Sequence, residues 1–142
     1  MIQFPQRWTL FDYVDLRKTN TIKEWAEILE KKSLAKLNRK LEILEQTGPD
    51  LAPGLLKGTK LPRIDKVKIE GRVSHALMIC RGPIHLQEEM TLLLGVPEKD
   101  RKLPAGTVEK ADSKRLEVES NPLERRCLHE RVFWKTEKRT TG

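Results

Sequence analysis

The sequence contains few of the residues that build covalent or metal-bound frameworks. Its 142 residues include two cysteines, three histidines and one tyrosine. Cys80 and Cys127 lie far apart without CxxC spacing, which argues against a disulfide scaffold or a zinc finger. The dispersed histidines form no HExxH or HxH pattern, so no metal site is expected. We expect the protein to work without a metal and without a cofactor.

Long apolar runs are also missing. No window approaches the roughly 18 consecutive apolar residues of a membrane-spanning helix. The opening stretch, "MIQFPQRWTLFDYVDL", contains Arg7 and acidic residues where a signal peptide needs an unbroken apolar segment. Two unpaired thiols suit a reducing compartment. We therefore expect a cytoplasmic protein that does not bind a membrane.

Charge is abundant. Charged residues make up 35% of the chain, hydrophobic residues 37%, and the net charge is +7. A basic surface attracts anions, and nucleic acid is the commonest such partner of a small basic protein.

The length predicts a single domain over 1–142, with a core at about 7–122 and a tail over 123–142 that adds at most a short strand before becoming disordered.

The first third of the chain predicts one strand and two helices. Residues 7–16 alternate as in a strand with one better-buried face. Asn20 or Thr21 can cap the following helix, Ser33 can cap the next, and Gly48 ends it. Two apolar stripes with helical spacing face a core: Ile22, Trp25, Ala26 and Leu29 in the first helix, and Leu34, Leu37, Leu41 and Leu44 in the second.

The rest of the chain predicts a sheet and one more helix. Residues 48–62 hold three Gly and three Pro and read as an extended connection. An antiparallel meander follows, then a charged helix over 106–119 with Val108, Ala111 and Leu116 facing inward, then a short tail strand over 127–134. The meander strands are expected at 63–71, 72–81 and 89–96. The fold class is α+β, with the helical hairpin on one face of a small, mainly antiparallel sheet and the opposite face open for function.

Basic residues concentrate around the expected first hairpin of the meander. Between residues 57 and 81 there are two acids and seven basic residues, a balance of +5: Lys57, Lys60, Arg63, Lys66, Lys68, Arg72 and Arg81. Alternation directs Val67 and Ile69 toward the helices and Lys66 and Lys68 to the other face. The strand 72–81 is largely apolar on both faces, which is typical of a central strand. Either this surface grips phosphates with strong salt dependence, or the lysines merely protect an edge strand.

Three consecutive segments and a short ending carry a family resemblance. They are "NTIKEWAEILEKKSLAKLNRKLEILEQTGPDL" (20–51), with its Gly-Pro-x-Leu exit, the basic hairpin "LPRIDKVKIEGRVSHALMICRG" (61–82), "MTLLLGVPEKDRKLP" (90–104) and "HER" (129–131). In this order they resemble the RelE/HigB superfamily of toxin–antitoxin ribonucleases, and especially its phage-derived HigB-like branch. The resemblance covers roughly 8–132.

The resemblance implies a RelE-like fold and a cytoplasmic endoribonuclease that cleaves mRNA on the ribosome and is silenced by a cognate helix-turn-helix antitoxin. In this chemistry the RNA 2′-OH attacks the neighbouring phosphate without a metal, with a base, a cluster of cations and an acid assisting. Matching positions assign catalytic roles to Lys66 and Lys68 in the second strand, Arg72 at the turn and Arg81 at the end of the next strand.

The acid and the outer RNA contacts are less well defined. Members of the family often use an aromatic hydroxyl late in the chain, whereas the only tyrosine here, Tyr13, lies in the first strand. Lys99, Arg101 or His129 are the substitutes, and we include His129 among the catalytic candidates. The expected RNA-binding residues are Lys57, Lys60, Arg63, Lys99, Arg101 and Lys102.

Two histidines and one tryptophan have plainer interpretations. His75 is expected to pack in its strand as a hydrogen-bonded residue and His85 to be solvated in a turn, while Trp134 either stacks on bases or packs the tail. Two other functions stay open. The first is a catalytically inactive phage or prophage protein that binds RNA or the ribosome on the same scaffold, and the second is a phage assembly protein.

Overall fold

The structure is a computed structural model that describes residues 7–51 and 54–134. Within these residues the chain forms one mixed, open sheet and four α-helices, so the α+β class is confirmed. In chain order the elements are β1 (Thr9–Tyr13), α1 (Thr21–Glu27), α2 (Lys31–Thr47), the 3-10 turn η1 (Pro49–Leu51), β2 (Lys57–Gly58), β3 (Asp65–Ile69), β4 (His75–Arg81), β5 (Glu89–Pro97), α3 (Thr107–Ser120), α4 (Pro122–Arg125) and β6 (Arg126–Leu128). None of these helices is long and apolar enough to cross a membrane.

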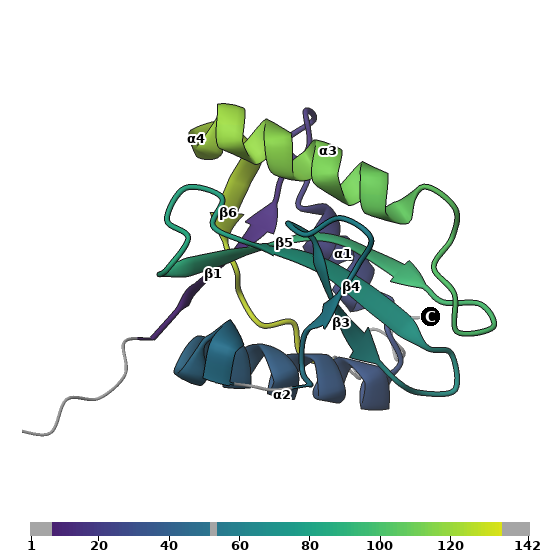
Figure 1. Ribbon diagram of the computed structural model, residues 1–142. Helices are drawn as coiled ribbons and strands as arrows, with labels where there is room; N and C mark the ends of the chain where they lie inside the picture. Colours follow the sequence, from purple (N-terminus) through teal and green to yellow (C-terminus); the bar gives the residue numbers. More distant parts are fainter. Residues whose placement is uncertain (1–6, 52–53, 135–142) are drawn as a thin grey trace, which may run out of the picture.

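The sheet has the strand order β2-β3-β4-β5-β1-β6 (Figure 1). β3, β4 and β5 form the antiparallel meander that the sequence predicts, with β4 as a central strand. β1 lies beside β5 and runs parallel to it, and β6 adds to the outer edge of β1 in antiparallel orientation. The first and last strands of the chain therefore pair with each other at one end of the sheet.

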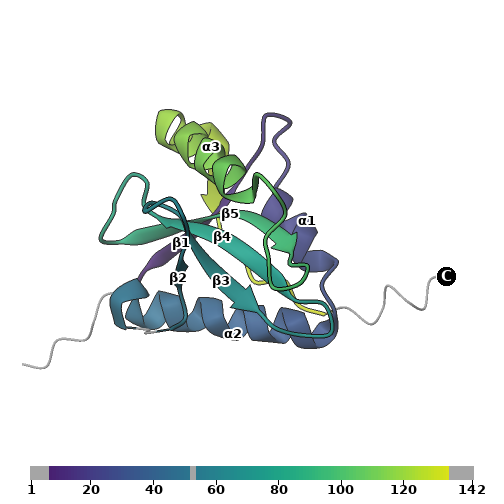
Figure 2. The ribbon, with the colours of Figure 1, turned by 45° about the vertical axis from the view of Figure 1, so that its right-hand side comes forward.

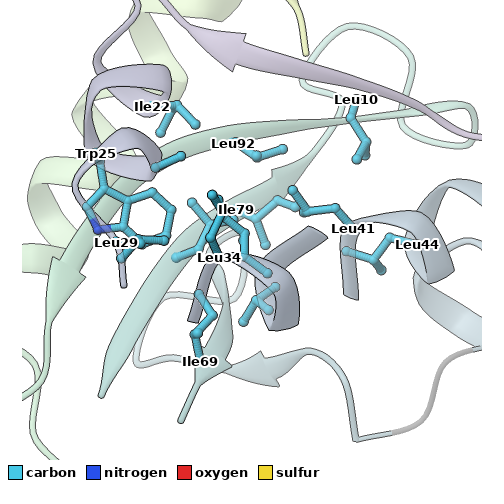
Figure 3. Close-up of a cluster of buried hydrophobic side chains, with 14 of the residues drawn as sticks. Leu10, Ile22, Trp25, Leu29, Leu34, Leu41, Leu44, Ile69, Ile79 and Leu92 are labelled. Atoms are coloured by element: carbon cyan, nitrogen blue, oxygen red, sulfur yellow. The ribbon is translucent and has the colours of Figure 1, made fainter. Parts of the chain in front are cut away.

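One face of the sheet packs against α1 and α2 (Figures 2 and 3). Both predicted helical stripes are buried there, and Leu41 and Leu44 have no exposed surface. The sheet contributes alternate residues, including Val67 and Ile69 of β3 and Leu77 of β4. Each fully buried leucine or isoleucine stabilises the fold by about 1.5–3 kcal/mol through removal of apolar surface from water. This face contains the larger of the two cores.

The opposite face is not open, and the expectation that it is free for function is wrong. α3 lies across it, as Figure 1 shows, and buries Val108 and Ala111 against a second core. The sheet side of that core is Ile64, Ala76, Met78, Cys80 and Leu93. Because β4 and β5 are apolar on both faces, each face needs a covering layer. Leu116, predicted to face inward, is 47% exposed, and Arg115 and Val118 are buried instead.

The element ends agree with the predicted signals only in part. Asn20 caps α1, because its side chain accepts a hydrogen bond from the Lys23 amide, and Gly48 ends α2 with φ of +78°. α2 begins two residues before Ser33, so Ser33 is not its cap. The connection 48–62 is not wholly extended, since it contains η1 and the two-residue strand β2.

The tail differs most from its prediction. α4 follows α3 directly, and the last strand is β6, shorter and earlier than the predicted strand over 127–134. Beyond β6, the chain continues from His129 to Trp134 without regular structure, and Val132 and Trp134 pack against the larger core. The predicted disorder at the chain end falls on 135–142, which lie outside the described residues.

Candidate nucleic-acid interface

Lys66 and Lys68 project from β3 on the face that carries α3, as their alternation predicts. Their neighbours across the ladder are Met78 and Ala76 of β4, both in the smaller core. The strand ladder thus places two amines at the border between the α3 core and solvent.

The Lys66 amine meets a buried carboxylate. Its Nζ lies 3.3 Å from Oε2 of Glu98, and the Glu98 side chain is only 1% exposed. The other carboxylate oxygen, Oε1, is buried without a hydrogen-bond partner among the described residues. The Glu98 amide donates to the Ser74 carbonyl at 2.8 Å, which anchors the residue just beyond β5. A buried carboxylate is costly unless it is paired, so the contact with Lys66 offsets part of the cost of burying Glu98.

A tight turn after Glu98 carries three more cations. Lys99 and Lys102 exchange backbone hydrogen bonds of 3.0 and 2.9 Å, and the two residues between them, Asp100 and Arg101, have φ of +53° and +62°. Two consecutive left-handed residues are typical of a type I′ turn, which usually contains glycine. A non-glycine residue in this region costs about 1–2 kcal/mol, so the turn holds its charged side chains at a cost in stability.

These elements enclose a cavity of about 350 Å³, which we call the cationic cleft; it is lined by Lys68, Arg72, Val73, Ser74, Glu98, Lys99, Asp100 and Arg101. Its lining holds four cations and two carboxylates. Lys66 borders it and lines an adjoining cavity of about 390 Å³ together with Lys60 and Lys102. Six of the residues predicted from the sequence to bind or cleave RNA, with Lys60 at the margin, are therefore gathered around Glu98.

Two further lysines of α2 reach the same edge of the sheet. The Nζ atom of Lys36 donates to the backbone carbonyl of Glu70, and that of Lys40 donates to the backbone carbonyl of Lys68. The two lysine side chains thus cover the part of the β3 edge that does not pair with β2. The pKa of Lys40 is lowered, chiefly by burial and further by Lys36, Lys57 and Lys68, although Glu70 opposes the shift. Lys57 itself is exposed on β2. Neither α2 lysine was identified from the sequence.

Arg81 and Arg63 lie at the other end of the hairpin. β4 runs six residue steps from His75 to Arg81, about 20 Å at 3.3 Å per step, so Arg81 cannot share a site with Arg72. Arg81 forms an ion pair with Asp50 at 2.5 Å and lines a separate cavity of about 660 Å³ with Arg63, Asp65 and the buried Arg115. Burial raises the pKa of the Asp65 carboxyl there, and Arg81 opposes the shift.

His129 is also remote from the cleft. Its Nδ1 lies 2.7 Å from Oδ1 of Asp12, with both side chains at most 3% exposed, and Asn20 donates to the second oxygen of Asp12 at 2.9 Å. Asp12 lies on β1, three strand positions from Lys68, a lateral separation of about 14 Å. The histidine also lines a cavity against α2, on the face opposite α3. His129 and the lysines therefore do not form one site.

The remaining aromatic and histidine candidates have structural surroundings. Tyr13 donates to Glu117 at 2.9 Å, and burial, with the Glu117 contact, raises its pKa to about 12. His75 is half-buried with its ring edge toward Trp25, and burial lowers its pKa. His85 is exposed in the turn before β5. The solvated position of His85 and the packing of His75 are confirmed, but the expected hydrogen bonding of His75 is not, since its Nδ1 is buried without a partner among the described residues.

Sequence reasoning missed Glu98. The available signal was its position, an acid directly after the strand "EMTLLLGVP" and before Lys99, where the end of β5 returns to the basic hairpin. No group of three or more His, Cys, Asp or Glu side chains within 7–51 and 54–134 is arranged to hold a metal ion. Comparison of the chain with models of known protein families found no match, and neither did comparison with curated proteins.

Proposed function

We propose that this protein is a RelE/HigB-like toxin that cleaves mRNA on the ribosome by attack of the RNA 2′-OH on the neighbouring phosphate. The observation that carries the proposal is the Lys66–Glu98 pair at the border of the cationic cleft. An acid and a base beside a cluster of cations are what this reaction needs. The order of elements, with one strand, a helical hairpin and then an antiparallel meander, supports the RelE-like assignment.

Each step has a candidate residue. Lys68, Arg72 and Arg101 hold the phosphate and the negative charge that develops on it. Glu98 takes the proton of the 2′-OH as its oxygen bonds to phosphorus. Lys66 gives a proton to the 5′-oxygen as the P–O5′ bond breaks, which leaves a 2′,3′-cyclic phosphate and a 5′-OH. Transfer of the proton from Glu98 to Lys66 across their 3.3 Å contact then restores both groups.

The proposal is tested by induced expression with mapping of mRNA ends. The parent chain should stop growth and cut translated mRNA, whereas Lys68→Ala and Glu98→Gln should lower the cleavage rate about 10²–10⁴-fold, the usual contribution of an acid–base group. Lys23→Ala, an exposed lysine of α1, is the matched control and should behave as the parent. Relief of the arrest by a small helix-turn-helix protein from a neighbouring reading frame would identify the expected antitoxin. Normal growth with intact mRNA at high expression would refute the nuclease.

A second candidate is an RNA- or ribosome-binding protein on the same scaffold without catalysis. It is favoured by the absence of a tyrosine or histidine from the cationic cleft, since Tyr13 and His129 are both buried elsewhere. Salt-sensitive RNA binding that Lys68→Ala weakens, with no cleavage, would select this function. Self-assembly without RNA affinity would instead select the phage assembly protein.

A further inference from the structure

A second cavity lies on the face of the molecule opposite α3, between α2 and the segment that follows β6. Its volume is about 690 Å³. The segment runs from β6 toward α2, as the yellow trace in Figure 1 shows, and it is held there by the Asn38 side chain, which donates to the Val132 carbonyl at 2.8 Å. The His129 amide donates to the Leu10 carbonyl at 2.9 Å. Because both ends of the segment are anchored, this cavity, which we call the tail cavity, has a fixed wall.

The tail cavity is lined by three arginines and two glutamates. These are Arg7, Arg39, Arg131, Glu42 and Glu45. Arg131 pairs with Glu45. Arg7 and Arg39 take part in none of the ion pairs formed within 7–51 and 54–134. Two guanidinium groups are therefore left to bind an anion, beside the single carboxylate of Glu42.

The tail cavity is also lined by an exposed aromatic ring, that of Phe133. Residues 129, 131 and 133 line the tail cavity, while the alternating Val132 and Trp134 pack against the larger core. Phe133 is consequently turned outward and is 68% exposed, although a phenylalanine is normally buried. An exposed ring among arginines is the combination that proteins use to stack the bases of single-stranded nucleic acid while they hold its phosphates.

His129 adds a polar atom that lacks a partner. Its side chain is 3% exposed and its Nδ1 is engaged by Asp12, but Nε2 has no hydrogen-bond partner among the described residues. Because Asp12 engages Nδ1, Nε2 is the ring nitrogen left for a ligand, and it donates or accepts according to the protonation of the ring. A ribose hydroxyl or a polar group of a base supplies the partner that this nitrogen lacks.

We propose that the tail cavity is a second site for single-stranded RNA, with a base stacked on Phe133, a phosphate held by Arg7 and Arg39, and a hydroxyl or amino group bound to His129. The proposal rests on the proposed function only in taking RNA as the ligand, since it requires no cleavage. A single nucleotide carries one phosphate, whose charge Arg7 and Arg39 can neutralise. An acidic peptide carries several carboxylates, which Glu42 and Glu45 would repel. The cationic cleft and the tail cavity lie on opposite faces of the sheet and share no lining residue.

The test measures binding of a fluorescently labelled, single-stranded RNA of 12 identical nucleotides to the full chain at low salt. The background variant is Lys68→Ala/Arg72→Ala/Arg101→Ala, which removes the cationic cleft and leaves the tail cavity intact. In that background, Phe133→Leu should weaken binding at least about fivefold, as loss of one stacked base does, and Arg39→Gln should lower both the affinity and its salt dependence. Phe133→Trp should preserve binding. Arg17→Gln, an exposed arginine outside both sites, is the matched control.

Unchanged affinity in both Phe133→Leu and Arg39→Gln would overturn the proposal, and so would loss of all RNA binding in the background variant. Displacement of the RNA by polyglutamate with equal efficiency in the parent and in Phe133→Leu would also overturn it, in favour of an acidic peptide ligand. Failure of the nuclease is distinguishable, because cleavage and growth arrest would then be absent while binding in the background variant still depends on Phe133.

Discussion

The carboxylate of Glu98 is buried almost completely, and within the described residues it forms an ion pair with Lys66 at 3.3 Å. The two residues come from different parts of the chain, and only the pairing of β3 with β4 and of β4 with β5 brings them together. Because Glu98 is 1% and Lys66 20% exposed, removal of the amine leaves a carboxylate that water cannot solvate. This pair therefore affects stability as well as any chemistry in the cationic cleft.

Lys66→Met is expected to destabilise the protein by about 1–3 kcal/mol, the usual cost of leaving a buried polar group without its partner. Lys66→Met/Glu98→Met should cost less than the sum of the two single changes, because the double variant leaves no unpaired charge. Urea denaturation of the four proteins gives the coupling energy between the residues. Single-variant effects that add within about 0.5 kcal/mol would show that the two groups do not interact.

Gly95 provides a second test of packing. A Cβ built on Gly95 would lie 2.0 Å from the ring of Trp25, so the indole of α1 rests directly on the backbone of β5. Gly95→Ala should therefore destabilise the fold by about 1–3 kcal/mol through overpacking. The cost should shrink when Trp25→Leu is present, since the smaller side chain leaves space for the methyl group. Thermal unfolding of the single and double variants measures both effects, and an equal cost of Gly95→Ala in the two backgrounds would contradict this contact.

Residue spacing was sufficient to predict most of the fold. The stripe that contains Leu37 and Leu41 faces the core because a helix turns every 3.6 residues, and Lys66 and Val67 face opposite ways because a strand alternates. α3 was harder to interpret, because it has few apolar residues. Its buried face includes Arg115, whose guanidinium is bound by Asp112 and Glu119, while Leu116 beside it is exposed.

The candidate site could be predicted only where its residues are neighbours in sequence. Lys68 and Arg72 follow from one hairpin, but the Lys66–Glu98 contact depends on the register of three strands, which no local pattern reveals. The separation of Arg72 from Arg81 follows from the length of β4. His129 reaches Asp12 only because β6 pairs with β1, which sets where the tail runs.

The two cysteines should differ sharply in reactivity. Cys80 is fully buried on β4, and burial raises its pKa to about 12, whereas Cys127 is exposed on β6. A thiol-specific dye at pH 8 should therefore add once to the native chain, on Cys127, and a second time only after unfolding. Mass spectrometry of the native protein, and of Cys127→Ser as the control, distinguishes the two sites. Equal native labelling of both thiols would contradict the covering of this face by α3.

Tyr13 is the only tyrosine in the chain, so its ionisation can be followed directly by ultraviolet absorbance. The native protein should titrate near pH 12, because burial and Glu117 disfavour the phenolate, and the urea-unfolded chain near pH 10. Since the folded-state pKa is raised, this contribution to stability is complete below about pH 10 and is lost as the pH rises to about 12. Tyr13→Phe should lose less stability than the parent over this interval, and because it keeps every other ionisable group it is the control for their contribution. A native titration midpoint near 10 would place the hydroxyl in water and contradict its contact with α3.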